Sequence, residues 1–306
     1  MFFSQLTLFC IIIALASLFG GSLPTLVKLT HRRIQLTLSF VSGVMLGVAL
    51  LDLLPHAIVK LEYQIEWTLA ICLFGLLFMF FMMRMFHFHQ HDLAFEHEHE
   101  HKHKELCDHD QDHHHVHCDK HEGSVDFSWL GLCLGLAIHT IIDGIALAAA
   151  VQSISPTGYS FAGVGVFLAI LLHKPLDALS ITSLMSAKGW APNKQLTVNL
   201  VFSLMCPLGA LIFAVSVEQF DQLRDVVLGV ALAFSAGIFL CISLGDLLPE
   251  VHFHSHDRVK LSIMLIFGVL IAFLLEFIPG HDHSGGKPTP DNIEATGNES
   301  GSADKQ

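Results

Sequence analysis

Eight long apolar stretches constrain the fold of this 306-residue chain more than any other feature of its sequence. A helix needs about 17 to 25 mostly apolar residues to cross the hydrocarbon core of a bilayer. The stretches that reach this length are residues 6–28, 34–58, 66–86, 128–152, 160–186, 196–217, 226–250 and 261–279. We therefore predict an all-α, polytopic membrane protein with eight transmembrane helices in a lipid bilayer.

The composition agrees with this prediction and excludes several classes of protein. Hydrophobic residues make up 52% of the chain and charged residues 14%, whereas soluble domains contain about 25% charged residues. The 28 Asp and Glu against 16 Lys and Arg give a formal charge of -12. A nucleic-acid partner is excluded, because phosphate binding needs a basic surface, and a cationic partner is favoured. The seven cysteines give no readable disulfide pattern.

Lysine and arginine are distributed unevenly over the loops that join the apolar stretches. Eight of them lie in the short loops of one face, and only Lys60 and Arg224 lie in those of the other. Cytoplasmic loops are enriched in these residues, so we expect both termini outside. The chain would then be a multi-pass integral protein of the cell (inner) membrane or of an organelle membrane.

An internal repeat relates the second apolar stretch to the seventh. Residues 40–55, FVSGVMLGVALLDLLP, align without gaps on residues 234–249, FSAGIFLCISLGDLLP. In the topology above these two stretches run in opposite directions. Inverted repeats are typical of secondary transporters, whose substrate sites lie near the membrane midplane. Apolar helices resemble one another by composition alone, but the shared Asp-Leu-Leu-Pro argues against chance.

The stretches and the repeat together predict an inverted 3+2+3 arrangement with five parts. These are a first three-helix repeat at residues 1–86, a His-rich cytoplasmic loop at 87–127, two metal-site helices at 128–186, an inverted second three-helix repeat at 187–279 and a disordered external tail at 280–306. The tail is assigned from its Gly, Ser, Pro, Asn and Asp content.

The fourth and fifth stretches each contain a histidine and an aspartate one helical turn apart. His139 and Asp143 are one pair, and His173 and Asp177 are the other. Residues four apart share a helix face, and ionisable groups in mid-membrane are costly without a partner or a function. Two imidazoles and two carboxylates at matching depth predict a tetrahedral zinc site or, with added waters, a site for iron or manganese.

The same pairs also fit polar contacts that merely hold helices together. The recurrence of one spacing at one depth on consecutive helices favours a ligand cluster instead. Pro175 supports this interpretation, because it removes a backbone hydrogen bond to the carbonyl of Leu171 and opens the helix beside the pair.

Lys174 is the unusual member of this group, because a buried ammonium is itself a cation. It could neutralise surplus carboxylate charge, held by Asp143 or Asp177, so that only one divalent ion binds. Its long stem could equally reach the membrane interface or another acid. The sequence leaves both possibilities open.

Further acids and histidines extend the predicted ion path beyond the midplane. Asp52 and His56 lie late in the second stretch and would mark an entrance from outside. Asp246, Glu250 and His252 lie late in the seventh stretch and would mark an exit to the cytoplasm. An ordinary interfacial position is the alternative for each of these residues.

The predicted cytoplasmic loop is a histidine-rich tract. It holds thirteen of the 22 histidines, among many acids. Such composition cannot form a packed core and is typical of metal binding. The histidines that we single out as an accessory site are His97, His99, His101, His103, His113, His114, His115 and His117. An uninvolved polar linker is the alternative.

At these residues the chain resembles the ZIP family of zinc and iron importers. The family's fourth helix carries His-Asn-x-x-(Asp/Glu)-Gly, matched by His139, Asp143 and Gly144 with Thr140 in place of the Asn. Its fifth helix carries a His or Gln followed four residues later by an acid, as here. The resemblance implies a binuclear site reduced to one metal, with the ammonium of Lys174 where the second ion would be.

Three other interpretations compete with an importer of divalent metal, chiefly zinc, into the cytoplasm. A zinc exporter of the cation diffusion facilitator kind usually has six crossings and a folded C-terminal domain. An intramembrane zinc hydrolase would need an acid-base set, and we find none, so we expect no enzyme. A metal sensor or buffer would depend on the loop alone. The sequence leaves open the metal, with iron or manganese as alternatives, the coupling ion and a homodimer.

Overall fold

The computed structural model describes residues 2–26, 31–86, 125–153, 163–220, 222–253 and 258–276, and the ordered elements in these ranges are all helices. They are α1 (Phe2–Leu26), α2 (His31–Gly47), the π-helical η1 (Val48–Leu53), α3 (Leu54–Lys60), α4 (Ile65–Phe86), α5 (Val125–Ser153), α6 (Val164–Ala187), α7 (Pro192–Ser203), α8 (Met205–Val217), α9 (Arg224–Phe253) and α10 (Arg258–Glu276). The prediction of an all-helical membrane protein is confirmed. Seven ranges are long and apolar enough to cross a bilayer, and a shorter apolar helix spans Val259–Leu275.

Two of the expected crossings contain more than one helix. The second consists of α2, η1 and α3, and the sixth consists of α7 and α8 with a break at Leu204. A proline follows each irregularity by a few residues, Pro55 after Asp52 and Pro207 after Leu204. Proline has no N–H, so it removes the hydrogen bond to the carbonyl four residues earlier. The chain adapts with a π-helical turn at the first place and a break at the second.

The fifth crossing begins four residues later than the sequence indicated. Gly163 precedes α6 and has a φ of 71°. That left-handed conformation cannot continue an α-helix, and glycine adopts it without steric cost. The helix therefore starts at Val164 rather than at residue 160.

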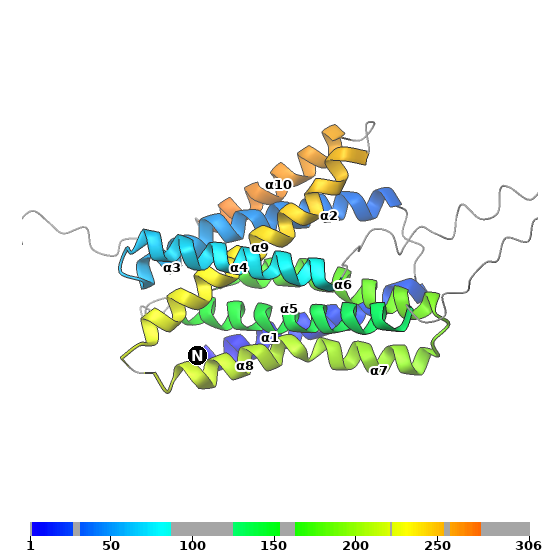
Figure 1. Cartoon of the computed structure of the whole chain (residues 1–306), viewed down its shortest axis with the longest axis horizontal. Helices are drawn as coiled ribbons and strands as arrows, with labels where there is room; N and C mark the ends of the chain where they lie inside the picture. Colours follow the sequence, from blue (N-terminus) through cyan, green and yellow to red (C-terminus); the bar gives the residue numbers. More distant parts are fainter. Residues whose placement is uncertain are drawn as a thin grey trace, which may run out of the picture.

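The helices pack as two groups that face each other (Figure 1). In one group α2 packs on α10 and α4 packs on α9, and in the other α1 packs on α6 and α5 packs on α8. α5 contacts α9 and α4, whereas α6 contacts α2 and η1, so these two helices line the boundary between the groups. The predicted metal-site residues lie on α5 and α6.

Two glycines let the helices of the first group approach closely. A Cβ on Gly43 of α2 would collide with the carbonyl of Leu265 on α10, and a Cβ on Gly237 of α9 would collide with the carbonyl of Cys72 on α4. Small residues at such crossings are typical of helix packing in membranes, because lipid supplies no hydrophobic drive between helices. The two glycines occupy equivalent positions of the sequence repeat.

Candidate metal centre

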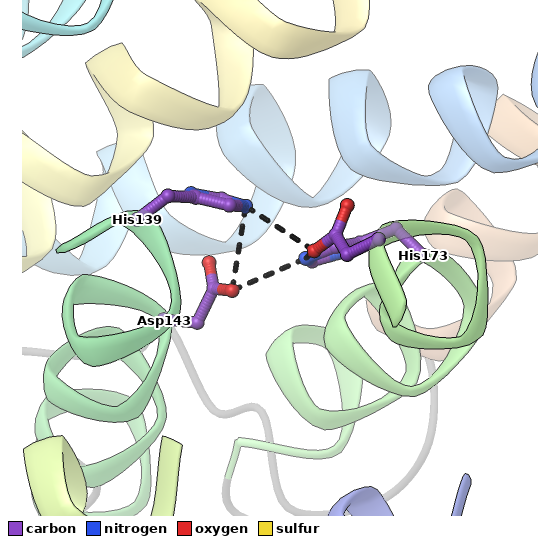
Figure 2. Close-up of side chains that lie close together, drawn as sticks. His139, Asp143 and His173 are labelled. Atoms are coloured by element: carbon purple, nitrogen blue, oxygen red, sulfur yellow. Dashed lines mark hydrogen bonds and ion pairs between the residues drawn. The ribbon is translucent and has the colours of Figure 1, made fainter. Parts of the chain in front are cut away.

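Helices α5 and α6 bring four potential metal ligands together in the interior. His139 and Asp143 project from α5 toward His173 on α6 (Figure 2), and Asp177 completes the group. Each pair is spaced by one turn, so both members face the neighbouring helix. The four side chains are buried, with exposed fractions between 0 and 6%.

The distances within this cluster suit a small cation. One ligand atom of each residue lies within 4.8 Å of the other three. The Asp143 Oδ2 is 3.4 Å from the His139 Nε2 and 3.2 Å from the His173 Nε2, and the Asp177 Oδ2 is 3.8 and 3.9 Å from the same nitrogens. Ligands about 2.0–2.1 Å from a tetrahedral zinc ion lie about 3.3 Å from one another. The cluster is thus slightly wider than a zinc tetrahedron.

The orientation of the His173 ring leaves its outer nitrogen available as a ligand. Its Nδ1–H donates to the carbonyl of Ala169 at 2.8 Å, since a carbonyl can only accept. In the neutral imidazole the Nε2 then carries a lone pair, which faces the Asp143 Oδ2. The His173 Nε2 and the Asp143 Oδ2 are then two acceptors only 3.2 Å apart, and a cation bound by both would stabilise this arrangement. A hydrogen bond that fixes the second nitrogen is the usual support of a metal-binding histidine.

Lys174 lies beside the cluster and is the largest fully buried side chain among the described residues. Its Nζ donates to the Asp143 Oδ2 at 2.6 Å, to the Thr140 Oγ1 at 2.9 Å and to the Asp177 Oδ2 at 3.4 Å. The Thr140 hydroxyl donates to the Leu136 carbonyl at 2.6 Å, so it can accept from the lysine. Three acceptors match the three donors of an ammonium. The lysine is therefore held in its charged form.

The formal charge of this site is negative overall. Asp143 and Asp177 contribute two negative charges, Lys174 contributes one positive charge, and the histidines are neutral as ligands. The Asp143 Oδ1 is buried and has no hydrogen-bond partner among the described residues. A buried carboxylate is costly unless it is paired, so the site favours a cation.

Asp52 and His56 form a separate pair on η1 and α3. The His56 Nδ1 lies 2.7 Å from the Asp52 carbonyl and 3.2 Å from the Asp52 Oδ1. The Asp52 Oδ2 is buried beside Gly165 on α6 and has no hydrogen-bond partner in the described part of the chain. Gly165 precedes His173 by eight residues, about 12 Å along a helix. The structure therefore does not bring this pair into the four-residue cluster.

The remaining predicted site residues lie outside what the structure describes. Asp246, Glu250 and His252 belong to α9, but their side chains are not among the described ones. The eight loop histidines, from His97 to His117, lie outside the described residues altogether.

Three contacts at the site were not anticipated from the sequence. The ring of Phe202 on α7 lies 5.6 Å from the Lys174 Nζ, and the ring of Phe239 on α9 meets the His173 ring edge-on at 6.2 Å. The third is the Ala169 carbonyl, which binds His173. The spacing of Ala169, four residues before His173 on one helix, could have indicated this contact. The two aromatic contacts come from distant parts of the chain and leave no local signal.

Sequence comparison with known proteins shows which family this chain resembles. The family model described as "ZIP Zinc transporter" matches residues 4–276. Zinc transporter ZIP9 of Macaca fascicularis is 35% identical over 164 residues, which are 49% of this chain and 67% of that protein. Zinc transporter ZIP9 of Micropogonias undulatus is 32% identical over 54% of this chain and 56% of its own length. Zinc transporter ZIP1 of Danio rerio is 27% identical over 53% of this chain and 51% of its own length. The alignments thus span about half to two thirds of these relatives.

Proposed function

We propose that this chain, which belongs to the ZIP zinc transporter family, imports a divalent transition metal into the cytoplasm through the cluster on α5 and α6. Its relatives are zinc transporters and not enzymes, so the hydrolase interpretation has no support. The observation that carries the proposal is the buried group of two imidazole nitrogens and two carboxylate oxygens within 4.8 Å. Ionisable side chains in mid-membrane mark ion pathways by default.

Zinc is the ion that we propose as the main substrate, with iron and manganese as weaker alternatives. Histidine nitrogens and aspartate oxygens are both zinc ligands, and the cluster is only slightly wider than a zinc tetrahedron. Iron and manganese take more ligands, which added waters could supply. The burial of the cluster limits such waters and favours the four-coordinate ion.

The inward direction is supported by the distribution of basic residues at the two ends of the helices. Arg84 lies in the last turn of α4, Lys188 follows α6 and Lys194 lies in the first turn of α7, at one end of the bundle. Lys60 and Arg224 lie at the opposite end, where α3 leads into α4 and α9 begins (Figure 1). The positive-inside rule assigns the first end to the cytoplasm. Both termini then lie outside.

The inverted repeat is supported by the packing of the helices. If the first three crossings correspond to the last three in reverse orientation, then α2 corresponds to α9 and α4 to α10. The pairing of α2 with α10 thus corresponds to that of α9 with α4. In the same way, the close approach of Gly43 on α2 to Leu265 on α10 corresponds to the close approach of Gly237 on α9 to Cys72 on α4. A site between repeats is suited to alternating access.

The path of the ion would run past Asp52 and His56 to the cluster and leave past Asp246 and Glu250. Asp52 supports the first step, because its buried Oδ2 lies beside the first turn of α6. That end of α6 is about 12 Å from His173 and faces outside in the proposed orientation. The loop histidines would receive or buffer the released ion.

Lys174 would limit this site to one ion. Its Nζ contacts both carboxylate oxygens of the cluster and Thr140. These oxygen atoms are the ones that a second cation beside the first would need. The ammonium thus stands where a second metal would bind.

Zinc uptake by proteoliposomes of defined orientation tests the direction and the choice of metal. We expect radioactive zinc to accumulate when the face with Lys60 and Arg224 is presented to the labelled solution, and excess iron or manganese to reduce it less than excess unlabelled zinc does. Protein-free liposomes provide the background. Zinc movement in the opposite direction only, toward the face with Lys60 and Arg224, would identify an exporter. The absence of any zinc flux would contradict the proposal.

A further inference from the structure

The contacts of Lys174 bear on the charge of the site as well as on the number of ions that it binds. Its ammonium is as fully satisfied as a bound metal would be, with three acceptors, and it shares the Oδ2 atoms of Asp143 and Asp177 with the histidines. The ring of Phe202 covers it at 5.6 Å. Lys174 directly follows His173 on α6, so the ammonium is tethered to the same helix as two of the ligands, His173 and Asp177.

A carrier that works by alternating access must close its site twice in each cycle, once loaded and once empty. When the ligands are carboxylates, the empty site is harder to close than the loaded site. Closure removes water from negative charge that no metal ion then compensates. In the simplest continuum description this desolvation penalty grows with the square of the net charge. The charge of the two states therefore decides which step is slow.

Because of Lys174, the empty site and the loaded site carry formal charges of equal size and opposite sign. With two aspartates, one ammonium and two neutral imidazoles, the empty site carries a formal charge of minus one, and a divalent ion makes it plus one. Without the lysine the loaded site would be neutral, but the empty site would carry minus two. Its squared charge would be four times larger, so the return of the empty site would be disfavoured.

We infer that Lys174 is a tethered counter-cation that allows the empty site to close and return, so that no second transported ion is needed for this step. The inference rests on the proposed function and concerns the energetics of the same site. The ammonium compensates part of the carboxylate charge after the metal leaves, and it remains beside the carboxylates when the metal returns. Asp143 Oδ1, which has no partner within the described residues, offers the metal a further ligand atom.

Net uptake and zinc exchange separate the return step from the loaded step. Net uptake into zinc-free liposomes requires the empty return, whereas exchange of labelled zinc with unlabelled zinc inside uses only the loaded site. In Lys174→Gln we expect net uptake to fall by at least about tenfold relative to exchange, while exchange persists. Lys188→Gln, just beyond the end of α6, is the matched control and should leave the ratio of the two fluxes unchanged.

A charge-compensated variant keeps the test decisive if Lys174→Gln weakens both fluxes. Lys174→Gln combined with Asp177→Asn restores a formal charge of minus one to the empty site. We expect its ratio of net uptake to exchange to recover toward that of the unaltered protein, although both rates fall with the lost ligand. A ratio of net uptake to exchange that Lys174→Gln leaves unchanged, or a lowered ratio that the added Asp177→Asn does not restore, overturns the inference. Absence of both fluxes from the unaltered protein would instead refute the proposed function.

Discussion

The substitution Asp143→Asn should reduce zinc uptake by at least about 100-fold, because changes merely behind a metal ligand already cost 10–100-fold. The Asp143 Oδ2 lies closer to the other groups of the site than the Asp177 Oδ2 does, with the His173 Nε2 at 3.2 Å, the His139 Nε2 at 3.4 Å and the Lys174 Nζ at 2.6 Å. An amide keeps the shape but supplies no charge to the ion or to the ammonium.

Initial rates of radioactive zinc uptake, corrected for the amount of protein inserted, measure this effect. Removing one partner of a buried ion pair costs about 3–5 kcal/mol, so thermal unfolding in detergent should be recorded alongside. Asp225→Asn is the matched control, since Asp225 pairs with Lys60 at the exposed start of α9. Uptake by Asp143→Asn within a few-fold of the unaltered protein would show that this carboxylate is not a ligand of the transported ion.

The substitution Lys174→Glu should increase the metal content of the protein from one ion to two. It replaces the ammonium by a carboxylate beside the Asp143 Oδ2, the Asp177 Oδ2 and the Thr140 Oγ1. Together these oxygens and the new carboxylate provide a ligand set for a second divalent ion next to the first. The second ion also compensates the added negative charge, which would otherwise be buried and unpaired.

Zinc bound per purified chain, measured by elemental mass spectrometry after dialysis, reports this change. Residues 87–122 should be deleted in both proteins, because their thirteen histidines would bind further zinc. Lys188→Glu provides the control for a surface change of equal charge. One ion per chain in both Lys174→Glu and the parent would mean that the lysine does not stand at a second metal position.

The apolar crossings could be predicted from the sequence because a membrane span has a minimum length that few other helices reach. Their interruptions could not be placed in the same way. Pro55 and Pro207 indicate local irregularity, but Pro175 lies within α6, which stays one helix. Whether a proline bends, breaks or is accommodated depends on the neighbours that satisfy the freed carbonyl. Those neighbours belong to other helices.

The grouping of His139 and Asp143 with His173 and Asp177 could be predicted from spacing and depth alone. A four-residue interval fixes which side chains share a helix face, and consecutive helices meet at equal depth. The position of Lys174 could not be predicted, because its flexible stem reaches several partners. Its contacts with Thr140 and Phe202 depend on the packing of α5, α6 and α7.

The central claim is that the ion crosses the membrane through the buried cluster and that the loop is accessory. Radioactive zinc uptake by oriented proteoliposomes of the unaltered protein, of His173→Ala and of a deletion of residues 87–122 tests it most directly. Ser180→Ala, further along α6, controls for a substitution on the same helix. We expect His173→Ala to abolish uptake, and both Ser180→Ala and the loop deletion to retain it. Normal uptake by His173→Ala would contradict the account and return the His-Asp pairs to a role in helix packing.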